Sequence, residues 1–214
     1  MNDENRQWHT NTIGKKVVDA LQKNRFSAAY FPTAAEAAQE ILKLITPTDT
    51  VGFGGSATVK EIGLLDELTK RGNTLFNHGQ SGLTPEESLD IRRKELTADV
   101  FLTSTNALTL DGQLVNVDGS GNRVAAMIFG PKKVIVVVGI NKVVSDTHEA
   151  YKRIQYEAAP INNKRLNRPN PCTTSGICMD CQGPSRICNV TTIIKKALPQ
   201  TPTFIFVIGE NLGF

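Results

Sequence analysis

The chain passes from short apolar residues into glycines at Thr50-Val-Gly-Phe-Gly-Gly-Ser56. An amphipathic segment from Ala57 to Lys70 follows, with apolar residues at a helical period, and Gly72 ends it. A strand that turns through glycines into a helix is typical of parallel α/β sheets, which bind ligands beyond the carboxyl ends of their strands. We therefore expect an α/β protein with a ligand site at this turn.

Short apolar segments alternate with helical patterns along the rest of the chain. The expected strands are 28–31, 50–53, 74–76, 99–102, 134–139 and 204–208. The expected helices are 12–26, 33–45, 57–70, one beginning at 84–87, 124–129, 146–158 and a short one at 191–198. Asp111-Gly112 predicts a hairpin between Asn106 and Asn116. This order favours an open, mostly parallel sheet flanked by helices, with a small hairpin element.

Length and composition limit the classes of protein to consider. The 214 residues, 40% hydrophobic and 21% charged, fit one domain over residues 11–214, after a polar N-terminal tail over residues 1–10. A net charge of +3 does not indicate a nucleic-acid partner, and Arg92-Arg93-Lys94 is interpreted as a solvated helix face. The N-terminus lacks the apolar region of a signal peptide, and Val134–Val138 is too short to span a bilayer. We expect a cytoplasmic protein without a membrane span, and a homo-oligomer is compatible with the sequence.

The glycine turn is the first candidate binding site. Glycines let the backbone approach an anion, and free N–H groups at a helix start attract negative charge. Neither a Walker loop nor the dinucleotide-binding spacing is present. We expect the turn to contact a phosphate or carboxylate, although a tight turn capped by serine is the structural alternative. The candidate residues are Gly52, Gly54, Gly55 and Ser56.

A second candidate segment runs from Asp111 to Arg123 and is rich in glycine and short polar side chains. Such residues bind sugar hydroxyls or phosphates, and they also build plain turns. The candidate ligand-binding residues here are Asn116, Asp118, Gly119 and Asn122. His78 follows the strand at 74–76 and is a candidate catalytic acid or base, with a structural role as the alternative.

The four cysteines of the chain fall in one segment, with the spacing C-x5-C-x2-C-x6-C: Cys172, Cys178, Cys181 and Cys188. They lie in a proline-containing insertion, residues 162–189, which we expect to be mostly loop. Three interpretations stay open: an iron–sulfur cluster that carries electrons, one zinc ion that orders the loop, or no metal with free or redox-active thiols. A reducing compartment argues against structural disulfides.

Three motifs in a fixed order resemble the LUD-domain (lactate utilisation protein) family. They are Val51-Gly-Phe-Gly-Gly-Ser-Ala-Thr-Val-Lys-Glu-Ile-Gly63, the segment from Ala98 through Asn116-Val-Asp-Gly-Ser-Gly-Asn122 to Arg123, and Phe129-Gly-Pro-Lys-Lys-Val-Ile-Val-Val-Val-Gly-Ile-Asn-Lys142. Ala159-Pro-Ile-Asn162 and Arg165-Leu166 follow them. The resemblance implies the fold of the glucosamine-6-phosphate deaminase, ribose-5-phosphate isomerase and CoA-transferase superfamily, whose members bind phosphosugars, acyl-CoA or related anions at the glycine turn.

The resemblance also implies two functional hypotheses. In the first, the protein is an enzyme or subunit of lactate-type 2-hydroxy-acid oxidation, uses a four-cysteine iron–sulfur site, and has an iron–sulfur or flavin protein as redox partner. In the second, it is a non-catalytic module that binds a phosphosugar or acyl-CoA-type anion, with structural zinc or free cysteines. The glutamate nucleophile of CoA transferases has no matching context, and Glu210 is the nearest candidate. The sequence leaves open whether the protein is an enzyme.

Overall fold

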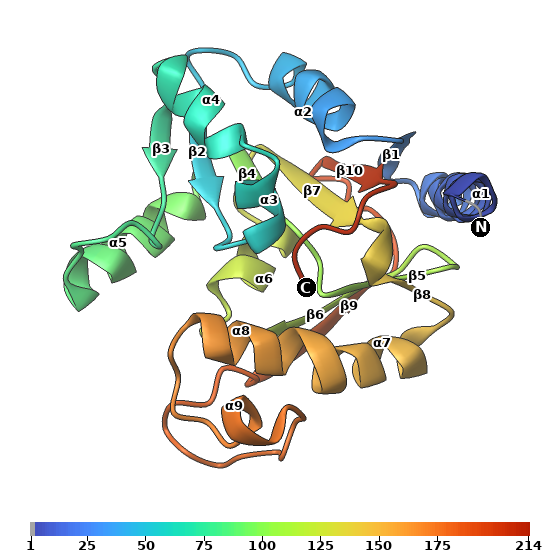
Figure 1. The fold of residues 1–214 in the computed structure, drawn as a ribbon. Coiled ribbons are helices and arrows are strands. Elements are labelled where there is room, and N and C mark those ends of the chain that lie inside the picture. The colour runs from blue at the N-terminus through green and yellow to red at the C-terminus, as the bar shows by residue number, and fades with distance from the viewer. Residues whose placement is uncertain (1–2) are drawn as a thin grey trace.

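A six-stranded parallel sheet forms the centre of the computed structural model, which describes residues 3–214 (Figure 1). Every neighbouring pair of strands in it is parallel. In spatial order the strands are β1 (Ser27–Phe31), β10 (Thr203–Ile208), β7 (Lys133–Gly139), β4 (Val100–Thr103), β2 (Thr50–Phe53) and β3 (Thr74–Phe76). The expected strands and the α/β fold class are therefore confirmed.

A second, four-stranded sheet lies beside the first. Its order is β8 (Val143–Val144), β5 (Ala107–Thr109), β6 (Leu114–Asp118) and β9 (Val190–Ile194). The predicted hairpin is confirmed, because β5 and β6 are antiparallel and joined through Asp111-Gly112. The helix predicted over 191–198 is wrong: β9 pairs with β6 along five residues, so β-branched Thr191, Thr192, Ile193 and Ile194 extend the sheet.

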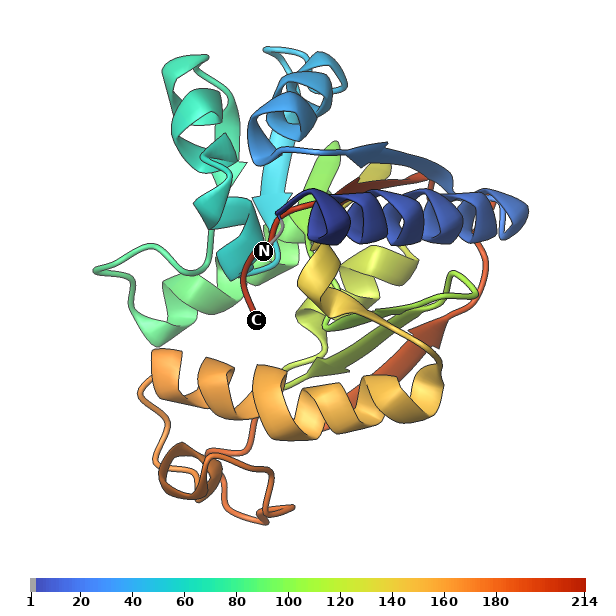
Figure 2. The same cartoon turned by 45° about the vertical axis from the view of Figure 1, so that its right-hand side comes forward.

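Helices cover both faces of the large sheet (Figures 1 and 2). On one face lie α2 (Ala34–Lys43), α3 (Ala57–Glu61) and α4 (Leu64–Lys70). On the other lie α1 (Asp3–Lys23), α6 (Asn122–Ile128) and the inner strands of the second sheet. Successive side chains of β7 pack into the hydrophobic cores on opposite faces of the sheet. Val134, Val136 and Val138 pack on one face, and Ile135 and Val137 pack on the other.

A long helical segment covers the outer face of the second sheet. It consists of α7 (Thr147–Arg153), a π-helical turn η2 (Ile154–Ala158) and α8 (Ala159–Arg165). We expected this helix to end before Pro160, but the proline lies in the first turn of α8, and the helical segment continues into it through the π-helical turn. Residues 162–165 of the predicted cysteine-rich insertion therefore belong to α8, and the rest is loop apart from α9 (Cys172–Ser175).

Two further differences from the predicted helices were found, and one helix start is confirmed. The segment predicted as one helix over 57–70 is divided between α3 and α4, because Gly63 adopts a left-handed conformation at φ 75°. Residues 3–10, assigned to a tail from the sequence, are the first turns of α1. The helix predicted to begin near Thr84 is α5 (Pro85–Glu95), and Thr84 and Glu87 form its capping box.

Within residues 3–214, no helix combines the length and apolarity that crossing a membrane requires.

Candidate functional site

A cavity of about 310 Å³ opens where β2, β3 and β4 end. Strand β2 lies between β3 and β4. The chain therefore runs from β2 to its neighbour on one side, β3, and then crosses to its neighbour on the other side, β4. The loops after neighbouring strands then diverge and leave a crevice, which is the usual ligand position in open α/β sheets. The loop before α6, helix α8 and the cysteine-rich insertion complete the wall.

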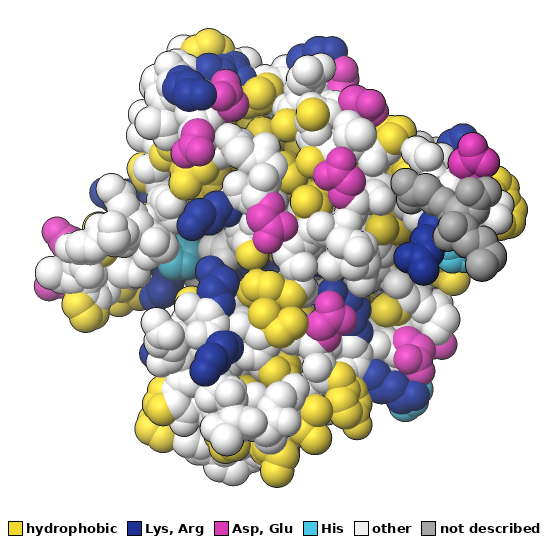
Figure 3. Space-filling view, viewed as in Figure 1, with side chains coloured by type: hydrophobic (Ala, Val, Ile, Leu, Met, Phe, Trp, Pro, Cys, Tyr) yellow, Lys and Arg dark blue, Asp and Glu magenta, His cyan; other side chains and the backbone are white. Residues whose placement is uncertain are grey.

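Basic side chains far outnumber acidic ones in this wall (Figure 3 shows Lys, Arg and His atoms gathered between α3 and α8). They are His78, Arg92, Arg123, Lys142, Arg165 and Arg168. Among the described lining residues, the single acidic side chain is Asp118, and it pairs with Arg123 at 3.4 Å. The remaining cations of the wall are Lys142, Arg92, Arg165 and Arg168. No carboxylate of residues 3–214 lies within ion-pair distance of any of them. The cavity therefore carries an uncompensated positive charge.

The glycine turn forms one side of the cavity. Gly54, Gly55 and Ser56 line it, and Gly55 has a φ of 68° that favours glycine. A Cβ atom at Gly54 would lie 2.7 Å from Oγ1 of Thr103, so glycine is required for the close approach of β2 and β4. The Ser56 hydroxyl accepts a hydrogen bond from Val59 N as a helix cap, which leaves its own hydrogen free to donate.

Gly52 does not line the cavity, in contrast to the expectation from the sequence. It lies inside β2, paired with Phe76 and Phe101, and a Cβ atom there would be 3.1 Å from the Cα atom of Glu95. Its role in the structure is to let α5 pack closely on the sheet.

The segment from Asn116 to Arg123 mostly positions one arginine. Asn116 is fully buried outside the cavity, and its Oδ1 accepts a hydrogen bond from Nη1 of Arg123 at 2.7 Å. Asp118 lines the cavity, but its carboxylate accepts from the backbone N–H groups of Ser120 and Gly121 and pairs with Arg123. The sequence predicted both residues as ligand contacts; the structure uses them to hold Arg123. Gly119 and Asn122 do line the cavity.

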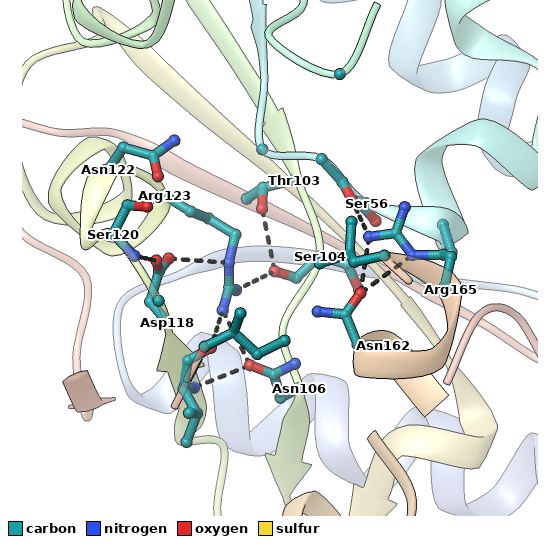
Figure 4. A pocket seen from close by; sticks show the side chains of 18 of the residues that line it. Ser56, Thr103, Ser104, Asn106, Asp118, Ser120, Asn122, Arg123, Asn162 and Arg165 are labelled. Carbon is teal, nitrogen blue, oxygen red and sulfur yellow. Dashed lines mark hydrogen bonds and ion pairs between the residues drawn. The ribbon is translucent and has the colours of Figure 1, made fainter. Parts of the chain in front are cut away.

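Arg123 is the centre of a hydrogen-bond network (Figure 4). Besides Asn116 and Asp118, it donates to the backbone oxygens of Ser104 and Val117 and to Oδ1 of Asn106. These partners account for all five of its N–H donors. Burial lowers the pKa of the guanidinium and Asp118 opposes that shift. Arg123 thus adds positive potential to the cavity without a donor left for a guest.

Arg165 and Arg92 are differently placed. Arg165 reaches from α8 across the cavity, donating through Nη2 to Gly55 O at 3.2 Å and to Asn162 Oδ1 at 2.7 Å (Figure 4). Arg92 lies on α5, and its Nε is buried without a hydrogen-bond partner among residues 3–214. The interpretation of Arg92-Arg93-Lys94 as a solvated face is wrong for Arg92 alone, because Arg93 and Lys94 are exposed. An unpaired buried donor beside a cavity indicates a missing acceptor.

His78 is fixed by a buried glutamate. Glu95, 1% exposed, accepts from the backbone N–H of His78 at 3.2 Å and lies 2.7 Å from its Nδ1. Asn122 Nδ2 contacts the other carboxylate oxygen at 3.5 Å. The remaining ring nitrogen, Nε2, lies beside the glycine turn, 3.4 Å from where a Cβ atom of Gly55 would be. A ring oriented in this way presents one nitrogen to the cavity for proton transfer.

Lys142 lies in a 3₁₀ turn, η1 (Ile140–Lys142), directly after β7. Only 3% of the residue is exposed, yet it lines the cavity. Its Nζ donates to Oγ1 of Thr58 at 2.8 Å and to Oγ of Ser104 at 3.0 Å. Burial, together with the charges of Arg153 and Arg123, lowers its pKa to about 7.

The cysteine-rich insertion borders the cavity through Arg168 and Ile187, and Asn189 Nδ2 donates to Gly119 O at 2.9 Å. All four cysteines are free thiols. Burial and the nearby Cys178 raise the pKa of Cys188 to about 11, and burial and Cys181 raise that of Cys172. In the described part of the chain, no three His, Cys, Asp or Glu side chains are arranged to hold a metal ion. The thiols therefore lie near one another without forming a ready-made metal site.

The other predicted catalytic residue is not in the site. Glu210 is exposed after β10 and does not line the cavity. Four residues of the site were not expected from the sequence: Lys142, Glu95, Arg123 and Arg165. Lys142 had a detectable signal, because it is a charged residue three positions behind the strongly apolar strand β7. Arg123 follows the polar, glycine-containing segment that was already a candidate. Glu95 had no such signal in the sequence, because it belongs to a highly charged helix whose pattern predicts a solvent-exposed surface.

Comparison with known proteins identifies a matching family model and a solved structure of similar fold. The family model described as LUD domain matches residues 14–208. A DUF162 family protein from Deinococcus radiodurans has a similar structure, with a TM-score of 0.52 and 15% identity over 93% of this chain and 98% of that one. The eIF2B delta structure from Chaetomium thermophilum gives a TM-score of 0.36 and 20% identity over 55% of this chain and 51% of its own. A comparison with curated proteins finds no match.

Proposed function

This chain belongs to the LUD-domain family, and from that premise we propose that its cavity binds a small organic anion, a carboxylate or a phosphate ester. The observation that carries the proposal is the excess of cationic groups around one cavity. Arg92, Lys142, Arg165 and Arg168 face it without a carboxylate partner among the described residues. Guanidinium groups recognise carboxylates and phosphates through paired, charge-assisted hydrogen bonds.

The size of the cavity suits a small metabolite. Ligand pockets commonly measure roughly 300 to 1,000 Å³, and this one, at about 310 Å³, lies at the lower end. A compact acid or phosphosugar fits such a volume more readily than a whole coenzyme A molecule, which would have to extend into solvent. Gly54 and Gly55 line the same cavity without side chains, and Arg165 reaches the oxygen of Gly55 there.

The LUD family is associated with lactate utilisation, and 2-hydroxy acids are carboxylates of the right size. We therefore propose lactate-type acids as the first ligands to test. His78, oriented by Glu95, would exchange a proton with the hydroxyl group of the bound acid. Oxidation of that acid also requires an electron acceptor, for which we propose an iron–sulfur or flavin protein as partner. A non-catalytic module that senses a phosphosugar or acyl anion is the alternative, and a location in the cytoplasm stays a prediction.

A ligand panel tests the binding proposal. The melting temperature of the full chain would be measured with L-lactate, pyruvate, glycerol 3-phosphate, ribose 5-phosphate and coenzyme A, against sodium chloride at equal ionic strength. A ligand present at 100 times its dissociation constant stabilises the folded state by about 2.7 kcal/mol, which is readily measured as a shift. A specific shift with one class of anion supports the proposal and identifies the class. Equal curves for every ligand and for the chloride control contradict it.

The cysteines support a second proposal, that Cys172, Cys178, Cys181 and Cys188 take an iron–sulfur cluster or a zinc ion. The mutual influence of the thiols on their pKa values favours it, because it places the four sulfurs in one neighbourhood. Their present arrangement does not fit a metal, so loading must move the loop and remove protons from the thiols. Anaerobic purification followed by iron, sulfide and zinc analysis distinguishes a cluster, zinc and bare thiols. Metal-free protein after anaerobic reconstitution would rule out both metals.

A further inference from the structure

Lys142 is a buried cation without a counterion. Its residue is 3% exposed, and no carboxylate of residues 3–214 lies within 4.0 Å of its Nζ. Burying an unpaired ammonium group is costly, so folding favours the neutral amine. Structural lysines normally avoid this situation by reaching solvent or a carboxylate. Lys142 instead ends beside the cavity proposed to bind an anion.

The two hydroxyl partners of Lys142 determine the direction of its hydrogen bonds. Thr58 Oγ1 donates to Leu212 O at 3.3 Å, and Ser104 Oγ donates to Thr105 O at 3.3 Å. Each hydroxyl has a single hydrogen, so both oxygens accept from the Nζ of Lys142. A neutral amine has two hydrogens and one lone pair. Both hydrogens are thus engaged, and in the described chain the lone pair has no hydrogen-bond partner.

Burial is the main cause of the lowered pKa of Lys142, and neighbouring charges add to it. Arg153 on α7 and Arg123 on α6 lower its pKa, and Glu61 on α3 and Glu157 on η2 oppose them more weakly. A pKa of about 7, far below the usual 10.5, leaves free amine available at neutral pH. Burial beside another cation is the arrangement that turns lysine into a nucleophile.

We propose that Lys142 forms a Schiff base with a small carbonyl compound that carries an anionic group and is held in the same cavity. The proposal rests on the anion site proposed above. The Nζ lone pair attacks the carbonyl carbon and forms a C–N bond. The carbonyl oxygen leaves as water with the two amine hydrogens, and the resulting imine takes up one proton from solvent. No electrons are exchanged, so the step needs no oxidant or reductant.

Two carbonyl compounds test the source of the negative charge. Pyruvate carries a carboxylate and dihydroxyacetone phosphate carries a phosphate, whereas L-lactate and glycerol 3-phosphate are their non-carbonyl counterparts. The full chain is incubated with each carbonyl compound and sodium cyanoborohydride, and reduced adducts are located by peptide mass mapping. We expect one adduct at Lys142, suppressed by the matching non-carbonyl anion. An adduct with one compound alone identifies its anionic group as the one recognised.

Two variants serve as controls. Lys142→Arg keeps the positive charge and should lose the adduct, whereas Lys133→Arg, on β7 outside the cavity, should keep it. Mapping on the unchanged protein decides the question even if Lys142→Arg does not fold. Calorimetric binding of L-lactate or glycerol 3-phosphate without any adduct at Lys142 overturns the Schiff base and leaves the anion site standing. Neither binding nor an adduct overturns both proposals.

Discussion

The buried carboxylate of Glu95 holds His78 by two atoms at once, the backbone N–H at 3.2 Å and Nδ1 at 2.7 Å. The first contact fixes the loop after β3 and the second fixes the ring. The imidazole cannot turn away without breaking a bond to a carboxylate that is 1% exposed. Its Nε2 is therefore held toward the glycine turn, which is the geometry expected of an oriented acid or base.

Removing this carboxylate should destabilise the protein. Glu95→Ala leaves the N–H of His78 without its acceptor and opens a space in the interior, so we expect the free energy of unfolding to fall by about 1 to 3 kcal/mol. Urea denaturation measures the change. Glu86→Ala, on an exposed position of the same helix, should change it by less than about 0.5 kcal/mol. Equal effects of the two substitutions would show that Glu95 does not hold the loop.

Substitutions of Arg123 and Arg165 should have different effects on the free energy of unfolding and on anion binding. Arg123→Met removes the donor of a buried network and leaves Asp118 without its cation, so we expect a loss of about 3 to 5 kcal/mol in unfolding free energy. Arg165→Met affects an exposed side chain and should cost less than about 1 kcal/mol while weakening anion binding. Thermal and urea unfolding of both variants provide the comparison. A larger loss of stability at Arg165 would contradict these assignments.

The depressed pKa of Lys142 predicts how stability depends on pH. The unfolded chain binds the proton up to about pH 10.5, but the folded protein releases it near pH 7. Between these values the unfolded state holds more protons, so stability rises with pH by at most about 1.4 kcal/mol per unit from this group. In Lys142→Met the slope of unfolding free energy against pH from 7 to 9 should become smaller. An unchanged slope would show that Lys142 titrates normally.

Asp99 should make the stability of the protein depend on pH in the acidic range. Lys132, followed by the N–H and hydroxyl of Thr50, holds the pKa of Asp99 well below its usual 3.8. Its stabilising effect is complete above that value and is lost as the pH falls through the lower folded pKa. Urea midpoints of Asp99→Asn should therefore lie below those of the unchanged protein at pH 6 and approach them in acid. A constant difference across this range would exclude the linkage.

The central sheet could be predicted because its strands are short apolar runs between clear helix and turn signals. Val134 to Gly139 is buried on both faces, so the apolar pattern and the structure coincide. The strand β9 could not, because Thr191 to Ile194 form a strand only through pairing with β6, a distant part of the chain. The break at Gly63 was masked by a continuous helical period on either side.

The sequence predicted where in the fold the candidate site lies better than it predicted the roles of individual residues there. The glycine turn indicated the correct edge of the sheet, and Gly54, Gly55 and Ser56 do line the cavity. The sequence could not show that Asn116 supports an arginine rather than a ligand, because that depends on hydrogen bonds formed across the fold. Nor could it separate Arg92 from its solvated neighbour Arg93, since helix orientation alone decides which one faces the cavity.

These two adjacent arginines allow the most direct test of the anion site. Isothermal titration calorimetry would compare the unchanged protein, Arg92→Met and Arg93→Met with whichever acid or phosphate ester in the panel raises the melting temperature most. Loss of a charge-assisted hydrogen bond of about 1.5 to 3 kcal/mol predicts roughly 10- to 150-fold weaker binding for Arg92→Met. Arg93 pairs with Asp90 on the surface, so its variant should bind within about twofold of the unchanged protein. Equal affinity in all three proteins, or no binding by any, would contradict the proposal that this cavity is an anion site.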